Sequence, residues 1–227
     1  MRKITASPSL MCMDLLHAGD QLQILDRHFD ALHFDIMDGH FCPNITLSPD
    51  LLKAVCAASP LPVDVHLMTT DPALFIPEAA KAGSKWISVH AETVNSSAFR
   101  TFDMISSLGC MPGLVLNPAT TLESVKYMLG RIDLLTIMTV DPGFAGQKFI
   151  PEMIGKIKEA AALRDKNGWH YKIQIDGSCR KATYKSLIEA GADMLILGSS
   201  GLFSLSDDLD EACRTAKADI AAACEGL

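Results

Sequence analysis

The sequence predicts an α/β protein in which eight parallel strands, with helices between them, close into a barrel. Three observations lead to this fold class. Short apolar runs alternate with longer amphipathic segments along the whole chain. The intervening segments are long enough for the crossover helices that parallel strands require. The length of 227 residues suits one such barrel.

The candidate strands are short runs rich in apolar residues. In chain order they span residues 4–9, 31–35, 63–68, 86–90, 113–116, 134–138, 172–176 and 194–197. Amphipathic segments at 14–27, 71–83, 96–109 and 184–193 predict helices between them, and a last helix is expected over 205–223. Gly83, Gly109 and Gly191 stand where helix C-caps are expected.

A doubly wound open sheet is the alternative with the same alternation. It would carry a glycine-rich turn after its first strand, and the residues there, "SPSLMCMD" at 7–14, include no glycine. No linker, low-complexity tract or charge block divides the chain. Residues 1–227 are therefore predicted to form a single-domain TIM (β/α)8 barrel.

The composition limits the partners. A formal net charge of −7 argues against a nucleic acid or an anionic membrane, but backbone N–H groups could still hold a phosphorylated substrate. Seven scattered cysteines without a C-x-x-C pair predict reduced thiols. The sequence has neither a secretory signal nor an apolar run of transmembrane length, so a cytoplasmic protein is expected.

Ionisable residues recur at the predicted strand ends. In such a barrel the active site lies at the C-terminal ends of the strands, and residues i and i+2 share a face. His33 and Asp35 on the second strand, His66 on the third and Asp176 on the seventh should therefore converge. They form a candidate site for zinc, manganese, cobalt or ferrous iron, which such mixed ligands suit better than calcium. The alternative is that each is a hydrogen-bonded polar residue near the barrel mouth.

Glycine-rich loops follow the last three strands, where barrels frequently bind phosphate. They are "VDPGFAGQKF" at 140–149, "DGSC" at 176–179 and "LGSSGLF" at 197–203, although each alone could be an ordinary turn. Three methionines, Met37, Met68 and Met138, also fall at strand ends. They are either gap-filling core or an apolar wall that keeps water from a reactive intermediate.

Taken together, these motifs resemble the ribulose-phosphate 3-epimerases along nearly the whole chain. The matching stretches are "SPSL" (7–10), "HFDIMDGHFCPNITLSP" (33–49), "VHLM" (65–68), "MTVDPGFAGQKF" (138–149), "DGS" (176–178) and "GSSGLF" (198–203). Some details resemble a sister branch, the allulose-6-phosphate 3-epimerases. These details are "LMCMD" at 10–14, Ala145 in "GFAGQ", Ser178 in "DGS" and the ending "GSSGLF".

The resemblance implies an isomerase that epimerises a ketose phosphate at C3 with one divalent metal ion and no organic cofactor. The branch details imply conversion of D-allulose 6-phosphate to D-fructose 6-phosphate, with D-ribulose 5-phosphate to D-xylulose 5-phosphate as the alternative. A homo-oligomer is also implied.

Site residues follow from the resemblance position by position. Asp35 and Asp176 are implied as the acid/base pair, and His33, Asp35, His66 and Asp176 as the metal ligands. The implied sugar contacts are Ser9 and His66, and the strand-end residues Met37, Met68 and Met138 are added as candidate substrate contacts from their positions. The implied phosphate contacts are Gly143, Phe144, Ala145, Gly146, Gly177, Ser178, Gly198, Ser199 and Ser200.

These residue types suit such a reaction. Only the neighbouring carbonyl acidifies the C3 proton, and its removal creates a cis-enediolate whose charge a metal ion can stabilise. Inversion of the carbon needs a base on one face and an acid on the other. Asp35 on the second strand and Asp176 on the seventh can flank a substrate from opposite sides of the mouth.

Other functions find less support in the sequence. A decarboxylase of the orotidine-phosphate type would carry D-x-K-x-x-D on the third strand, where this chain has "DVHLMT" at 64–69. A Schiff-base aldolase needs a lysine near the end of a strand, and Lys172 opens its strand instead. A non-catalytic sugar-phosphate sensor would be expected to have lost one of the two aspartates, and both are present.

Overall fold

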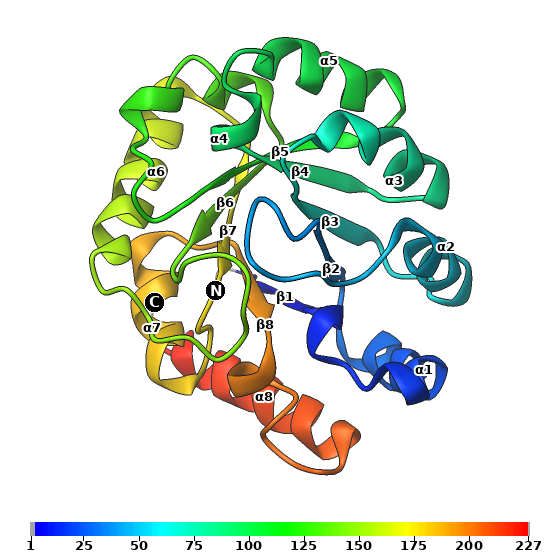
Figure 1. The fold of residues 1–227 in the computed structure, drawn as a ribbon. Coiled ribbons are helices and arrows are strands. Elements are labelled where there is room, and N and C mark those ends of the chain that lie inside the picture. The colour runs from blue at the N-terminus through cyan, green and yellow to red at the C-terminus, as the bar shows by residue number, and fades with distance from the viewer. Residues whose placement is uncertain (1–2, 227) are drawn as a thin grey trace.

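Eight parallel strands at the centre of the molecule close into a barrel, and helices surround them (Figure 1). The computed structural model describes residues 3–226. The strands in this range are β1 (Thr5–Pro8), β2 (Leu32–Met37), β3 (Val63–Met68), β4 (Trp86–His90), β5 (Met111–Leu116), β6 (Leu134–Met138), β7 (Lys172–Asp176) and β8 (Met194–Leu197). They pair in the order β1-β8-β7-β6-β5-β4-β3-β2, and a parallel bridge between Ser9 and His33 closes the ring. The predicted TIM-barrel fold is confirmed.

The helices cover the outside of the barrel, between successive strands. They are α1 (Ala18–His28), α2 (Pro49–Ala58), α3 (Ile76–Ala82), α4 (Ala91–Val94), α5 (Ala98–Ser107), α6 (Met153–Asn167), α7 (Lys181–Ala190) and α8 (Leu209–Ala223). Between β5 and β6 the chain forms 3-10 turns at Glu123–Val125 and Leu129–Arg131. No helix within residues 3–226 is long and apolar enough to cross a membrane.

Several helices begin later than the sequence pattern predicts, for local reasons. The helix expected over 71–83 starts with a 3-10 turn, and α3 proper begins only at Ile76, which places Pro77 in the first turn where proline is tolerated. The helix expected from residue 205 begins at Leu209. Asp208 fixes this start, because its side chain accepts hydrogen bonds from the backbone N–H groups of Asp210 and Glu211.

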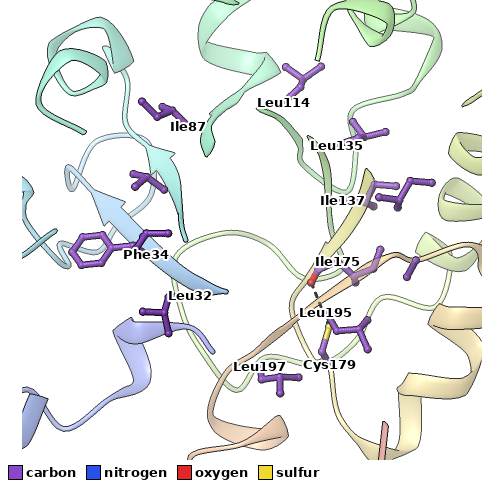
Figure 2. Packing of buried hydrophobic residues seen from close by; sticks show 14 of the residues in the cluster. Leu32, Phe34, Ile87, Leu114, Leu135, Ile137, Ile175, Cys179, Leu195 and Leu197 are labelled. Atoms are coloured by element: carbon purple, nitrogen blue, oxygen red, sulfur yellow. Dashed lines mark hydrogen bonds between the residues drawn. The ribbon is translucent and has the colours of Figure 1, made fainter. Parts of the chain in front are cut away.

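The main hydrophobic core lies between the strands and the helices. Figure 2 shows part of this cluster, with Leu32, Phe34, Ile87 and Leu195 among the side chains that the strands contribute. Because side chains alternate along a strand, the residues between these apolar positions point into the barrel. Those inward positions are largely polar and buried: Ser7, Ser9, His33, Asp35, Asp64, His66, Ser88, His90, Thr136 and Gln174.

The N-terminal end of the barrel interior is apolar. Trp86, Leu134 and Met194, each the first residue of its strand, form a small buried cluster there. The buried polar side chains of the interior therefore lie between this apolar cluster and the C-terminal mouth of the barrel.

Candidate active site and metal centre

Four residues predicted as ligands meet at the C-terminal end of the barrel. One ligand atom from each of His33, Asp35, His66 and Asp176 lies within 4.8 Å of the others. His33 Nε2 is 3.1 Å from Asp35 Oδ1 and 4.0 Å from Asp176 Oδ2. His66 Nδ1 lies 3.3 Å and 3.4 Å from the same two oxygens. Strands β2, β3 and β7 thus bring two nitrogens and two oxygens to one point.

The donor set fits a divalent metal ion. His33, Asp35 and His66 are buried, and Asp176 is partly exposed at the cavity floor. Among residues 3–226, nothing hydrogen-bonds His66 Nδ1, although this atom is buried. A buried polar atom is rarely left unpaired, and an imidazole nitrogen aimed at two carboxylates is suited to binding a cation.

The charges of the cluster depend on one another. Burial favours the neutral form of Asp35, but the neighbouring His33 and His66 imidazoles outweigh it and lower the pKa of that carboxyl far below its ordinary value. Burial likewise works to lower the pKa of His66, whereas the carboxylates of Asp176 and Asp35 raise it overall. Asp35 is therefore held in the ionised form, which a carboxylate needs to bind a divalent cation.

A buried polar network orients His33 from below. His33 Nδ1 lies 2.9 Å from Asp64 Oδ2, and Asp64 also accepts hydrogen bonds from Ser88 Oγ (3.0 Å) and Gln174 Nε2 (2.8 Å). Thr136 Oγ1 in turn donates to Gln174 Oε1 at 2.6 Å. Since the Asp64 carboxylate can only accept, it places a proton on His33 Nδ1 and turns Nε2 toward the cluster.

The sequence alternation along β3 and β7 puts Asp64 and Gln174 on the inward face but does not indicate a role for them. The alternation along β3 and β7 was the available signal. What it lacked was the contact itself, because the two residues are 110 positions apart and meet only when the barrel closes.

Ser9 lies beside the catalytic candidate Asp35. Its hydroxyl donates to Asp35 Oδ2 at 2.7 Å, and the serine also lines the cavity above the cluster. The side chain therefore holds one oxygen of Asp35 while the other faces the two imidazoles. Direct contact of Ser9 with a sugar stays a prediction.

A cavity opens above the cluster and is lined by every residue predicted to contact phosphate. These are Gly143, Phe144, Ala145, Gly146, Gly177, Ser178, Gly198, Ser199 and Ser200. Gly143 and Gly177 have positive φ angles of 125° and 111°, which few other residues adopt. Ser178 also has a positive φ, 52°, a left-handed conformation that is uncommon for a residue with a side chain.

The three methionines also line this cavity. Met37 and Met68 pack together with Cys42, whereas Met138 packs with Val115 and Val140. They cover two sides of the cavity with apolar surface. A role of the methionines in keeping water from a reactive intermediate stays a prediction.

Comparison with known proteins gives the family. The model of the ribulose-phosphate 3-epimerase family matches residues 5–203. A ribulose-phosphate 3-epimerase from Bacillus subtilis is 41% identical over 199 residues, which cover 87% of this chain and 91% of the relative. The chain belongs to the ribulose-phosphate 3-epimerase family.

Other matches agree with this membership. A ribulose-phosphate 3-epimerase from Escherichia coli K12 is 35% identical over 88% of this chain and 89% of its own length. A mutant tryptophan synthase α-subunit from Pyrococcus furiosus superposes with a TM-score of 0.68 at 17% identity, over 97% of this chain and 98% of the other, and so shares only the fold.

As a member of the ribulose-phosphate 3-epimerase family, the chain is an isomerase that acts on a carbohydrate phosphate. These relatives are named for ribulose phosphate, so the comparisons support the alternative substrate of the sequence analysis better than allulose 6-phosphate.

Proposed function

We propose that this protein epimerises a phosphorylated 2-ketose at C3 with a divalent metal ion, and that Asp35 and Asp176 exchange the proton. The observation that carries the proposal is the meeting of these two carboxylates with His33 and His66 at the floor of one cavity. The carboxylates come from β2 and β7, so they approach the cavity from different sides.

Each residue has a distinct task in this reaction. One aspartate removes the C3 proton and the other delivers a proton to the opposite face, which inverts the carbon. His33, Asp35, His66 and Asp176 would hold a divalent ion, which would supply Lewis-acid stabilisation of the negative charge that develops on the sugar. Backbone N–H groups in the loops after β6, β7 and β8 hold the phosphate. The methionines Met37, Met68 and Met138 exclude water from the enediolate.

The first candidate substrate is D-ribulose 5-phosphate, converted to D-xylulose 5-phosphate, because the named relatives carry this activity in their names. The second is D-allulose 6-phosphate, converted to D-fructose 6-phosphate. It is supported by Ala145 and Ser178, which depart from the ribulose pattern and lie in loops that line the cavity. An extra sugar carbon would have to be accommodated near this phosphate end.

Proton NMR in deuterated water with both substrates in parallel, with added manganese or cobalt, tests the proposal. Deuterium should enter C3 and the 3-epimer should appear. Faster turnover of ribulose 5-phosphate would support the first candidate, and faster turnover of allulose 6-phosphate would support the second. The absence of exchange with both would contradict epimerisation.

We also expect a homo-oligomer, as the resemblance implies. Light scattering on the purified protein gives its mass in solution, and a single-chain mass of 24.5 kDa would contradict this expectation.

A further inference from the structure

We propose that Glu92 and His90 form a relay that keeps the proton of His66 on Nε2 and thereby leaves Nδ1 free to bind the divalent ion. This inference rests on the proposed metal site. It makes His90 and Glu92 positioning residues, because both act through His66 and neither supplies a ligand atom to the cluster.

The relay runs outward from the cluster in two hydrogen bonds. His66 Nε2 lies 2.8 Å from His90 Nε2, and the two rings stack with their centroids 4.9 Å apart. On the far side of that ring, His90 Nδ1 lies 3.2 Å from Glu92 Oε2. Both imidazoles are fully buried, and the glutamate side chain is 26% exposed. Glu92, His90 and His66 therefore form a continuous chain from the edge of the barrel mouth to the cluster.

The direction of these hydrogen bonds follows from their ends. A carboxylate is only an acceptor, so the contact with Glu92 places a proton on His90 Nδ1. A neutral imidazole has one proton, which leaves His90 Nε2 as an acceptor. His66 Nε2 must then donate to it, because two nitrogens 2.8 Å apart need one proton between them. In neutral His66, the form that binds a metal ion, Nδ1 is left with its lone pair facing Asp35 and Asp176.

Glu92 is itself fixed by the loop after β5. Its Oε1 accepts from the backbone N–H of Asn117 at 3.0 Å and from the hydroxyl of Thr120. Lys156 Nζ secures the same loop by donating to the carbonyls of Asn117 (2.9 Å) and Pro118 (2.8 Å). With Oε1 occupied, Oε2 is the oxygen that faces His90.

The two metal-binding imidazoles are thus oriented by different means. Asp64 accepts directly from His33 Nδ1, whereas a carboxylate reaches His66 only through a second histidine. A carboxylate behind a metal-binding histidine commonly fixes its tautomer, and loss of such a partner weakens metal binding about ten- to a hundredfold.

The first test uses the wild-type protein and no substitution. Two-bond ¹H–¹⁵N correlation spectra of zinc-loaded protein with ¹⁵N-labelled histidine report which ring nitrogen carries each proton. We expect the proton of His90 on Nδ1 and that of His66 on Nε2. A proton on His90 Nε2 would overturn the relay.

The second test reverses the relay with Glu92→Gln, which keeps the shape of the side chain. Asn117 and Thr120 donate, so they retain the amide oxygen and leave the NH2 group facing His90 Nδ1. His90 would then donate from Nε2, and the proton of His66 would be displaced to Nδ1. We expect the cobalt dissociation constant, measured by titrating the visible absorption of Co²⁺, to rise about ten- to a hundredfold.

Glu123→Gln is the matched control, because Glu123 is exposed and pairs only with Lys126 among the described ion pairs. It should bind cobalt like the wild type. Wild-type cobalt affinity in folded Glu92→Gln would overturn the relay. Failure of the wild type itself to bind cobalt would instead contradict the metal site of the proposed function. Neither readout depends on epimerase activity.

Discussion

The two aspartates of the cluster have different surroundings. The Asp35 side chain is only 3% exposed and one of its oxygens accepts from Ser9, whereas Asp176 is 17% exposed at the cavity floor. Both are also ligand candidates, so each has one role toward the ion and another toward the substrate proton. Replacing either carboxylate by an amide therefore removes a base and weakens a metal ligand at the same time.

We predict that Asp35→Asn and Asp176→Asn each lower turnover at least about a thousandfold, the upper part of the range for removal of a general base together with some disruption of metal binding. Turnover is measured by following the appearance of the 3-epimer by NMR, and the bound metal is measured on the same samples. Exchange of the C3 hydrogen that survives in a variant should be confined to one of the two epimers, because the remaining aspartate reaches only one face.

Asn44→Ala is a useful control outside the cavity lining, because its side chain ties a loop by donating to the Gly143 carbonyl at 2.7 Å and accepting from the backbone N–H of Ile45 at 2.9 Å. It should affect the Michaelis constant more than turnover. Near-wild-type turnover in either aspartate variant would contradict the two-base assignment.

The four ligand candidates could be predicted from the residue pattern of each strand taken alone, whereas the residues that hydrogen-bond to these ligands could not. His33, Asp35, His66 and Asp176 each follow from alternation along one strand and from the rule that barrel sites lie at strand ends. His90 shares the inward face of β4, but the sequence leaves open whether it lines the cavity or forms a hydrogen bond. The contact with His66 that decides this depends on the relative positions of two strands.

At the scale of elements, Asp38 joins the loops that follow β2 and β3. Its Oδ1 accepts from the backbone N–H groups of His40 and Phe41 at 2.8 Å and 2.9 Å, and its Oδ2 accepts from the backbone N–H of Thr70 at 2.7 Å. Burial works against the charge, but these backbone hydrogen bonds lower the pKa of Asp38 to about 2. The loop also places Phe41 against the ring of His90, with centroids 4.3 Å apart.

We predict that Asp38→Asn lowers the free energy of unfolding by about 1 to 2 kcal/mol at pH 7, a modest value because the partly exposed carboxylate is screened by water. The folded pKa is depressed, so the charge stabilises the protein above the ordinary carboxyl pKa of 3.8. This contribution is lost as the pH falls from about 4 to about 2. Urea unfolding of the wild type and of Asp38→Asn across this pH range measures the contribution. A difference in the free energy of unfolding that stayed constant below pH 4 would contradict the role of the charge.

The loop after β8 depends on one close backbone approach. A Cβ added to Gly201 would lie 2.2 Å from the carbonyl oxygen of Cys179, which belongs to the loop after β7. Glycine is therefore needed for these two cavity-lining loops to lie together, and Tyr184 secures the contact by donating to the Gly201 carbonyl at 3.2 Å.

We predict that Gly201→Ala destabilises the protein by about 1 to 3 kcal/mol, because backbone and not a flexible side chain must move. The Michaelis constant should rise, since the displaced loop carries Ser199 and Ser200. Gly155→Ala is the control: it has open space around it in α6, where alanine favours a helix by about 1 kcal/mol. Thermal unfolding and steady-state kinetics compare the two variants with the wild type. Equal stability of Gly201→Ala and Gly155→Ala would contradict the steric requirement.

The observed bounds of the strands agree with those predicted from the sequence more closely than the bounds of the helices do. The predicted bounds of β3, β4, β6, β7 and β8 are those observed, because the outward positions of each short strand are apolar and the alternation has clear ends. Helix starts depend instead on caps and on the first turn, as at Asp208 and Pro77. The 3-10 turns between β5 and β6 had no signal in the apolar pattern.

At the scale of the whole molecule, closure of the barrel assembles the site. Strands β2, β3 and β7 lie far apart in the sequence, and their ends meet because β1 pairs with β8 on one side and contacts β2 on the other. The cluster therefore exists only in the folded chain. An ion that binds four groups from three strands binds the folded state and not the unfolded one, which couples metal occupancy to stability.

We predict that free cobalt or zinc at about a thousand times its dissociation constant raises the free energy of unfolding by about 4 kcal/mol over chelator-treated protein. For a chain of this size the melting temperature should rise by about 10 °C. Mg²⁺, which prefers oxygen ligands, should give a smaller shift because two of the donors are imidazoles. His66→Gln removes one of them and should abolish most of the cobalt-dependent shift. Differential scanning calorimetry with and without chelator measures these effects, and equal melting temperatures in chelator and in saturating cobalt would mean that the four residues form a polar network that binds no ion.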